Sequence, residues 1–269
     1  MTDDTVLAIN LAAAIFYAVG AVFLIYRTFY TRTTRNGWLL GFTAVTLILH
    51  AVGGIKILHH PQGLDLGIFK VGSLIFWVIN TLILASGLRK PLHTLFVFLF
   101  PLSSIFILMA MFSSDTVTAI PLDTSLSIHI MLSIFAYSFL IIATLQALVL
   151  SYQDYQLKHK HPAIIIRLLP PLQTMEALFF ELLWVGQILL TLAIVTGFLF
   201  LEDLFAQHLV HKTLLSIFAW VIYSTLLLGH YRLGWRGKTA VRWAVGGFII
   251  LLLAYFGSKF VLEILLQVP

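Results

Sequence analysis

Eight apolar stretches, separated by short polar segments, run along this chain. An α-helix of about 20 apolar residues crosses roughly 30 Å of hydrocarbon, because each residue adds about 1.5 Å. The pattern therefore predicts an all-α membrane bundle of about eight transmembrane helices, forming a single transmembrane domain over residues 1–269. The predicted spans are Thr5 to Tyr26, Gly37 to Leu58, Leu66 to Leu88, Leu92 to Phe112, Leu126 to Tyr152, Ala177 to Leu201, Leu209 to His230 and Thr239 to Leu262.

The composition indicates a protein whose main partner is membrane lipid. Hydrophobic residues make up 60% of the chain, charged residues make up 10%, and the mean hydropathy is +1.01. The chain has no cysteine, which excludes disulfides, thiolate metal sites and cysteine-linked haem. Any redox role must therefore come from a bound cofactor.

Most of the 16 lysines and arginines follow the first, third, fifth and seventh predicted spans. Short loops rich in these residues stay on the cytoplasmic side of a membrane. The opposite segments and both chain ends carry acidic residues, so the sequence predicts a multi-pass membrane protein with both termini outside. The net charge of +5 then reflects topology and does not indicate binding to nucleic acid.

His129 and His211 each lie near the start of an almost wholly apolar predicted span, and His50 lies inside another. The predicted topology places all three in the outer half of the membrane. An ionisable residue inside hydrocarbon is costly and is often functional. These residues are therefore the candidate site, although the sequence does not show which helix faces they occupy.

Three interpretations of the histidines remain open. Each imidazole either forms a hydrogen bond with a neighbour or reaches water, or the histidines bind a metal ion, or they bind haem iron. Haem also needs cationic groups near its propionates, for which the outer half offers Lys56, Lys70 and Lys212. The further residues that a metal-ion site would use are His59, His60, His208, Asp65, Glu202 and Asp203.

The sequence predicts no enzyme activity, because it has no phosphate-binding glycine loop, no Ser-His-Asp arrangement and no paired catalytic carboxylates. A membrane transporter or a metal-ion-handling protein without haem remains the rival class. Pro91, Pro101, Gly186 and Gly197 are positions where transporter-like helices could break.

Three segments of the chain resemble a known family. The segment from Ser127 to Tyr152, SIHIMLSIFAYSFLIIATLQALVLSY, resembles the histidine-bearing span of the cytochrome c assembly membrane family (CcsA, CcmC and HemX-like proteins). The segments LLWVGQILLTLAIVTGFLF and HKTLLSIFAWVIYSTLLLGHYRLGWRGKTAVRWAVGGFIILLLAYFGSKFV resemble the family's later spans, so the resemblance is strongest over 126–262. The GWRGK and YFGSKFV sequences are similar to those of its small YpjD branch.

The family resemblance implies haem handling on the outer side of a bacterial inner membrane, with other cytochrome c maturation proteins as partners. His129 matches a family histidine and inherits the role of iron ligand, while His211 is our hypothesis for the second. The chain departs from the family in lacking the tryptophan-rich WWD loop, since only EDLFAQH, residues 202–208, separates the sixth and seventh predicted spans. An accessory or regulatory role is therefore as credible as direct assembly.

Overall fold

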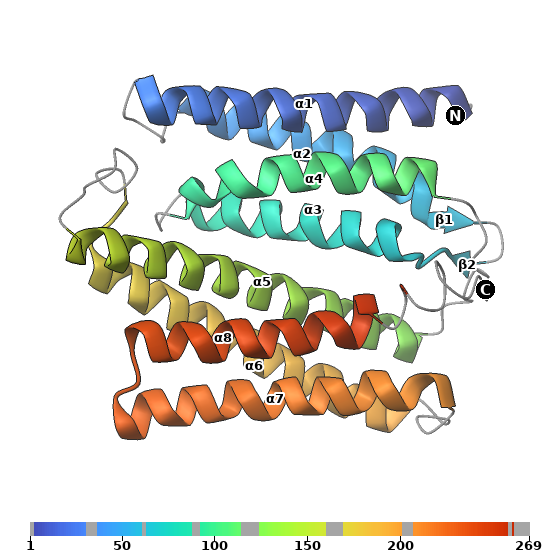
Figure 1. Ribbon diagram of the computed structural model, residues 1–269. Helices are drawn as coiled ribbons and strands as arrows, with labels where there is room; N and C mark the ends of the chain where they lie inside the picture. Colours follow the sequence, from blue (N-terminus) through green and yellow to red (C-terminus); the bar gives the residue numbers. More distant parts are fainter. Residues whose placement is uncertain are drawn as a thin grey trace. The chain divides into compact units, whose positions relative to one another are not determined.

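The computed structural model describes residues 3–30, 37–60, 63–87, 92–113, 124–159, 169–200, 207–257 and 260. These residues form eight α-helices and one short hairpin, which confirms the predicted all-α polytopic fold (Figure 1). In chain order the elements are α1 (Asp3–Tyr30), α2 (Gly37–Leu58), β1 (His59–His60), β2 (Gly63–Leu64), α3 (Ile68–Gly87), α4 (Phe96–Phe112), α5 (Thr124–Lys158), α6 (Leu172–Phe200), α7 (Gln207–Leu233) and α8 (Gly237–Leu252).

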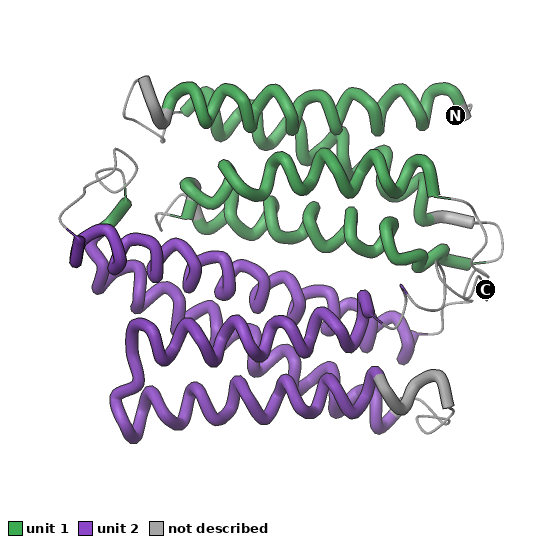
Figure 2. Tube along the Cα trace, in the orientation of Figure 1, with its two compact units in different colours: residues 1–121, 162–170, 269 green, residues 122–161, 171–268 purple. Residues whose placement is uncertain are grey.

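The helices form two compact units (Figure 2). Unit 1 comprises Met1–Pro121, Pro162–Pro170 and Pro269 and contains α1 to α4, whereas unit 2 comprises Leu122–His161 and Pro171–Val268 and contains α5 to α8. Within each unit the four helices form a ring, in which consecutive helices are neighbours and the fourth packs against the first. That the two units act as one transmembrane domain stays a prediction.

Seven of the described helices are long and apolar enough to cross a membrane. The exception is α4, whose 17 residues span about 25 Å. It begins four residues later than the predicted span because a 3₁₀ turn (His93–Leu95) precedes it. In contrast, α5 has 35 residues and is about 52 Å long, so it extends beyond the hydrocarbon.

A short segment before α3 explains where that helix begins. The sequence predicts a span from Leu66, but the helix starts at Ile68. The Asp65 carboxylate accepts a hydrogen bond from the Gly67 N–H at 2.9 Å, which satisfies an amide just ahead of the first turn. The hairpin of β1 and β2, in a segment where the sequence predicts no regular structure, lies immediately before this cap.

Polar side chains join neighbouring helices around the ring of unit 1. Apolar contact alone does not favour another helix over lipid, so hydrogen bonds and close packing select the neighbours. The ring has a polar contact at each of its four junctions, that is, between each pair of neighbouring helices. In ring order, these contacts join Tyr17 to His50 (3.2 Å), Trp77 to the Leu47 carbonyl (3.0 Å), Asn80 to Ser103 (2.7 Å) and Ser104 to the Ala14 carbonyl (2.9 Å).

Hydrogen bonds between side chains and neighbouring helices also join three of the four helix pairs of unit 2, whereas α7 and α8 meet by close packing. Where α8 passes into its π-helical turn (Leu253–Gly257), the Tyr137 hydroxyl of α5 donates to the Leu251 carbonyl. Between α7 and α8, Gly247 faces the ring of Tyr223, which a Cβ at that glycine would approach to 2.9 Å. The interhelical hydrogen bonds join Gln146 to the Met175 carbonyl (3.2 Å), Gln187 to Ser224 (2.7 Å), Trp220 to Thr191 (2.8 Å) and Tyr137 to the Leu251 carbonyl (2.8 Å).

Large apolar side chains cover the outside of the units, where lipid surrounds them. In α1, Ile15 and Val19 are exposed, whereas Ala13 and Tyr17 are fully buried. Ala13 and Tyr17 thus face the neighbouring helices, whereas Ile15 and Val19 face outward. This is the arrangement expected of a helix in a bilayer.

Close packing of α5 against α6 gives a stability prediction. A Cβ at Gly186 would lie 2.7 Å from Leu140 Cδ2, whereas a Cβ at Gly246 has nothing within 4 Å. We expect Gly186→Leu to lower the free energy of unfolding in detergent by about 1–3 kcal/mol through overpacking. Gly246→Leu should be neutral or stabilising, because glycine is a poor helix former. Thermal unfolding followed by circular dichroism tests both variants, and equal effects would contradict the packing argument.

Candidate functional site

His50 lies in the core of unit 1 and uses both of its ring nitrogens. Its Nδ1 contacts the Tyr17 hydroxyl of α1 at 3.2 Å, and its Nε2 contacts Ser73 Oγ of α3 at 2.9 Å. The side chain is only 2% exposed. The imidazole therefore joins α1, α2 and α3, as expected of a hydrogen-bonded core histidine.

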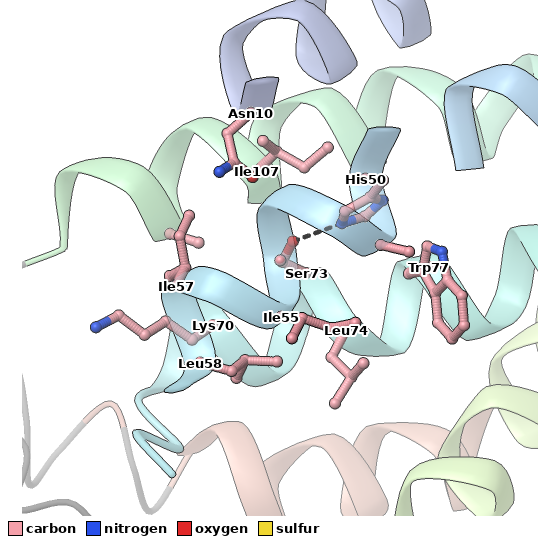
Figure 3. Close-up of a pocket in the computed structure, with 13 residues that line it drawn as sticks. Asn10, His50, Ile55, Ile57, Leu58, Lys70, Ser73, Leu74, Trp77 and Ile107 are labelled. Atoms are coloured by element: carbon pink, nitrogen blue, oxygen red, sulfur yellow. Dashed lines mark hydrogen bonds between the residues drawn. The ribbon is translucent and has the colours of Figure 1, made fainter. Parts of the chain in front are cut away.

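A cavity of about 90 Å³ adjoins His50 (Figure 3). It lies mainly between α2 and α3, with Lys70, Ser73 and Trp77 from α3 and Asn10 from α1 in its lining. This volume equals that of roughly three water molecules and is well below the roughly 300 Å³ at which ligand pockets begin. The cavity as it stands does not fit a haem macrocycle, and His50 as a haem ligand remains a prediction without support from this geometry.

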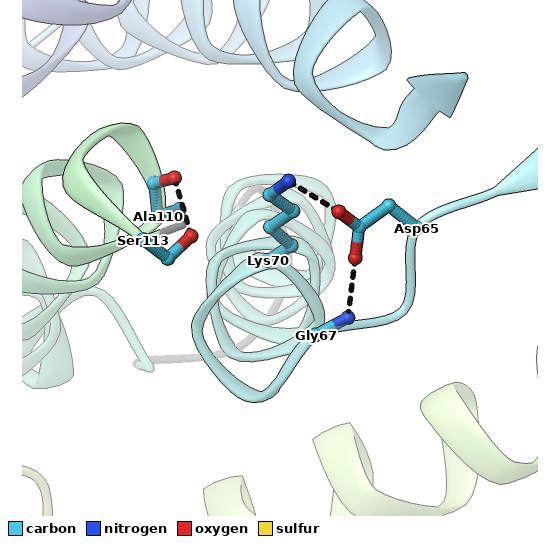
Figure 4. A network of polar contacts seen from close by, with 5 residues as sticks. All are labelled: Asp65, Gly67, Lys70, Ala110 and Ser113. Carbon is cyan, nitrogen blue, oxygen red and sulfur yellow. Dashed lines mark hydrogen bonds and ion pairs between the residues drawn. The ribbon is translucent and has the colours of Figure 1, made fainter. Parts of the chain in front are cut away.

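The three lysines predicted to meet haem propionates lie in different settings. Lys70 is buried and forms an ion pair with Asp65, whose second oxygen accepts from the Gly67 N–H (Figure 4). Lys56 is exposed in the last turn of α2, and Lys212 is half-buried near the start of α7. Lys56 and Lys70 thus belong to unit 1, whereas Lys212 belongs to unit 2.

His129 has a more open setting near the start of α5. Its side chain is half-buried, and its Nδ1 contacts Thr196 Oγ1 of α6 at 3.3 Å. The next residue of α6 is Gly197, where a Cβ would lie 3.1 Å from His129 Cε1. The glycine therefore lets the α6 backbone approach the imidazole edge. Thr196 and Gly197 together form a cradle for one side of His129.

The Thr196 hydroxyl has a defined direction in this cradle. It donates to the backbone carbonyl oxygens of Leu192 at 2.9 Å and Ala193 at 3.0 Å. A hydroxyl has only one proton, so when either carbonyl takes that proton the contact with His129 has the imidazole Nδ1–H as its donor. The imidazole also has a hydrogen bond to the backbone of Ala193 in the same helix, α6. In the neutral ring, Nε2 then carries the lone pair. That nitrogen is the one that can bind a metal or haem iron.

His211 lies in the first turns of α7, but its side chain is outside the described residues. Because α5 and α7 begin at the same end of unit 2, its backbone lies at the end of the unit that carries His129 (Figure 1). The metal-ion interpretation also rests largely on undescribed groups, including Glu202, Asp203 and the side chain of His208. Within the described ranges, no three His, Asp or Glu side chains gather as a metal site.

Sequence reasoning missed the residues that contact each histidine. The sequence suggested Gly197 only as a possible helix break, yet α6 continues through it. Thr196 gave no signal, because a single threonine in an apolar span usually bonds its own helix backbone. The sequence likewise gave no indication that Tyr17, which lies among the aliphatic residues of its span, would contact His50. Helical spacing alone does not show which helix the Thr196–Gly197 pair faces.

Comparison with known proteins identifies relatives over most of the chain. The sequence pattern of the family described as "Cytochrome C assembly protein" matches residues 38–266, which includes α2 to α8. The match thus begins well before the C-terminal half, where the sequence resemblance was strongest.

Individual relatives agree with this family. The chain is 38% identical to "Inner membrane protein YpjD" of Escherichia coli (strain K12) over 225 residues, covering 82% of this chain and 85% of that protein. It is 27% identical to "Protein HemX" of Brevibacillus brevis over 157 residues, covering 56% and 58% of the two chains. An uncharacterized 28.8 kDa protein of Azospirillum brasilense is 36% identical over 143 residues, covering 52% of this chain and 53% of that protein. No solved structure matches.

The buried ion pair beside the cavity gives a second stability prediction. Asp65→Asn removes the carboxylate that pairs with Lys70, and breaking a buried pair in this way costs about 3–5 kcal/mol. Asp154→Asn is the matched control, because Lys158 in that pair is 60% exposed and such pairs contribute about 0–1 kcal/mol. Unfolding in detergent measures both losses. An Asp65→Asn loss no larger than that of Asp154→Asn would contradict the assigned ion pair.

Proposed function

Because the chain belongs to the cytochrome c assembly protein family, we propose that it is a haem-handling protein of a bacterial inner membrane, acting in cytochrome c maturation or its regulation. It is a multi-pass membrane protein by the length and composition of its helices. Our proposal places the haem-binding site at the end of unit 2 where α5 and α7 begin, with His129 as the iron ligand.

One observation carries this assignment, namely the contrast between His129 and His50. Both ring nitrogens of His50 bond to other helices inside a core, whereas the described partners of His129, Thr196 and the Ala193 backbone, both lie in α6. The bond from Nδ1 orients the ring and leaves the lone pair at Nε2, as in metal-binding histidines. The half-buried setting of His129 also allows a ligand to approach, so the donor chemistry fits haem iron.

His211 and Lys212 complete the proposed site. Both lie at the start of α7, which begins at the same end of unit 2 as α5. We assign His211 as a second iron ligand and Lys212 as a partner of a haem propionate. Bound haem would supply the iron macrocycle that a maturation system delivers or senses, while the protein residues hold and orient it.

The segment between α6 and α7 supports haem handling more than direct transfer to an apocytochrome. Only residues 201–206 connect these helices, and they lack the tryptophan-rich loop of the family. Without that loop, an accessory or regulatory role in cytochrome c maturation is as well supported as direct assembly.

Absorbance of the purified protein tests the proposal. We expect protein expressed with ample haem and purified in detergent to show a Soret band, and His129→Ala to lose most of it. His159→Ala is the control, because His159 is an exposed histidine beyond the other end of α5 that bonds to the Tyr155 carbonyl. No Soret band in the wild-type protein, or equal bands in both variants, would overturn the assignment of His129.

Thr196 gives a more specific prediction. Thr196→Val keeps the shape of the side chain but removes the oxygen that accepts from His129 Nδ1. Losing such a supporting bond lowers metal affinity by about 10–100-fold, which haem titration of the haem-free protein would measure. Thr196→Ser retains the oxygen and should bind haem nearly as tightly as the wild type. Equal affinities for the Val and Ser variants would show that the hydroxyl does not orient His129.

A further inference from the structure

The turn between α7 and α8, together with the adjoining ends of both helices, carries four exposed cations: Arg232, Arg236, Lys238 and Arg242. We call these four residues the basic turn. Among the residues that the structure describes, none of the four forms an ion pair. Lys238 and Arg242 are four positions apart in α8, so they lie on one face of that helix. The basic turn is thus a concentrated positive surface on a chain with few charges.

The backbone beneath these cations is built as a rigid turn. Gly234 has φ +68°, and its N–H donates to the His230 carbonyl at 3.2 Å, which ends α7 with a left-handed residue. Gly237 has φ +53° at the start of α8. His230 Nδ1–H donates to the Trp235 carbonyl at 2.8 Å. The imidazole of His230 in α7 therefore holds the turn that follows against the end of that helix.

Aromatic side chains also pack against the turn between α7 and α8. His230 stacks on Phe180 with ring centroids 3.5 Å apart, and Trp235 stacks on Trp243 at 5.3 Å. A Cβ at Gly229 would clash with the Trp235 ring, so that glycine makes room for the indole. Tryptophan is enriched where membrane meets water. The stacked pair is therefore typical of the headgroup level.

We propose that the basic turn binds the phosphate of an acidic phospholipid from the protein's own membrane. The turn directly joins two helices that are long and apolar enough to span the membrane, which places its cations at the level of lipid phosphates. Arginine offers several planar donors to phosphate oxygens, and clustered basic residues beside a span attract anionic lipid.

The side chains of the basic turn, and not the amides of α8, are the binding groups. The carboxylate of Glu176 in α6 already accepts from the Gly237 N–H at 3.3 Å. It thus occupies the N-terminus of α8, where an anion otherwise binds. A phosphate would instead contact the exposed face formed by Lys238 and Arg242, with Arg236 beside it.

Lipid selectivity tests this proposal independently of haem. We would reconstitute the full chain in nanodiscs of phosphatidylcholine mixed with phosphatidylglycerol and measure retained lipid by native mass spectrometry. We expect the wild type to retain phosphatidylglycerol preferentially, and the double variant Lys238→Gln/Arg242→Gln to lose this preference several-fold. Lys158→Gln is the control, because that exposed lysine lies at the same end of unit 2 but already pairs with Asp154 at 2.7 Å. No preference in the wild type, or equal losses in both variants, would overturn the proposal.

A second variant distinguishes a built site from mere positive charge. His230→Ala retains all four cations but removes the hydrogen bond to Trp235, so we expect a weaker preference for phosphatidylglycerol. An unchanged preference in folded His230→Ala would contradict the preorganised site. Should His230→Ala fail to fold, the exposed Gln double variant still decides whether the cations bind the lipid. Loss of bound phosphatidylglycerol on addition of inorganic phosphate would overturn the lipid assignment in favour of a soluble anion.

Discussion

The arrangement of this protein depends on the cost of leaving a polar group unpaired in hydrocarbon. Apolar side chains gain little by leaving lipid for another helix, so apolar contact alone does not determine which helices pack together. Hydrogen bonds favour particular pairs of helices, and every junction of unit 1 has at least one polar contact. Ser104 shows the principle, because its hydroxyl crosses from α4 to a backbone carbonyl of α1. In unit 1, the few polar residues of the spans therefore determine which helices become neighbours, whereas the junction of α7 and α8 in unit 2 depends on close packing.

The same constraint separates two histidines that look equivalent in the sequence. In α2, partners on two other helices bind both ring nitrogens of His50, and the imidazole becomes a structural link. In α5, the partners of His129 among the described residues all lie in one helix, α6, where Gly197 lets the backbone approach the imidazole edge. What distinguishes the two histidines is thus the number of helices that bond to the imidazole, two for His50 and one for His129 among the described residues. This gives the proposed haem site a physical basis in addition to family membership.

Unit 2 has different chemistry at its two ends. The end where α5 and α7 begin carries His129 and the backbone of His211, whereas the opposite end carries the basic turn. At the latter, the imidazole of His230 again makes a structural bond, this time to the Trp235 carbonyl within the turn. The proposed functions follow this division: an imidazole nitrogen for iron at one end, and exposed cations for phosphate at the other.

The sequence by itself determined the class, the approximate spans and the family, because mean hydropathy and contiguous motifs are properties of local segments. It also identified His129 as the first candidate ligand. It did not show which residues would contact that histidine, and it placed Lys70 among the haem partners without indicating its ion pair with Asp65. In a soluble helix an apolar stripe marks the buried face, but a membrane span is apolar on every face. Only the tertiary structure decided which face of each span meets a neighbour, because that choice depends on hydrogen bonds between residues far apart in the chain.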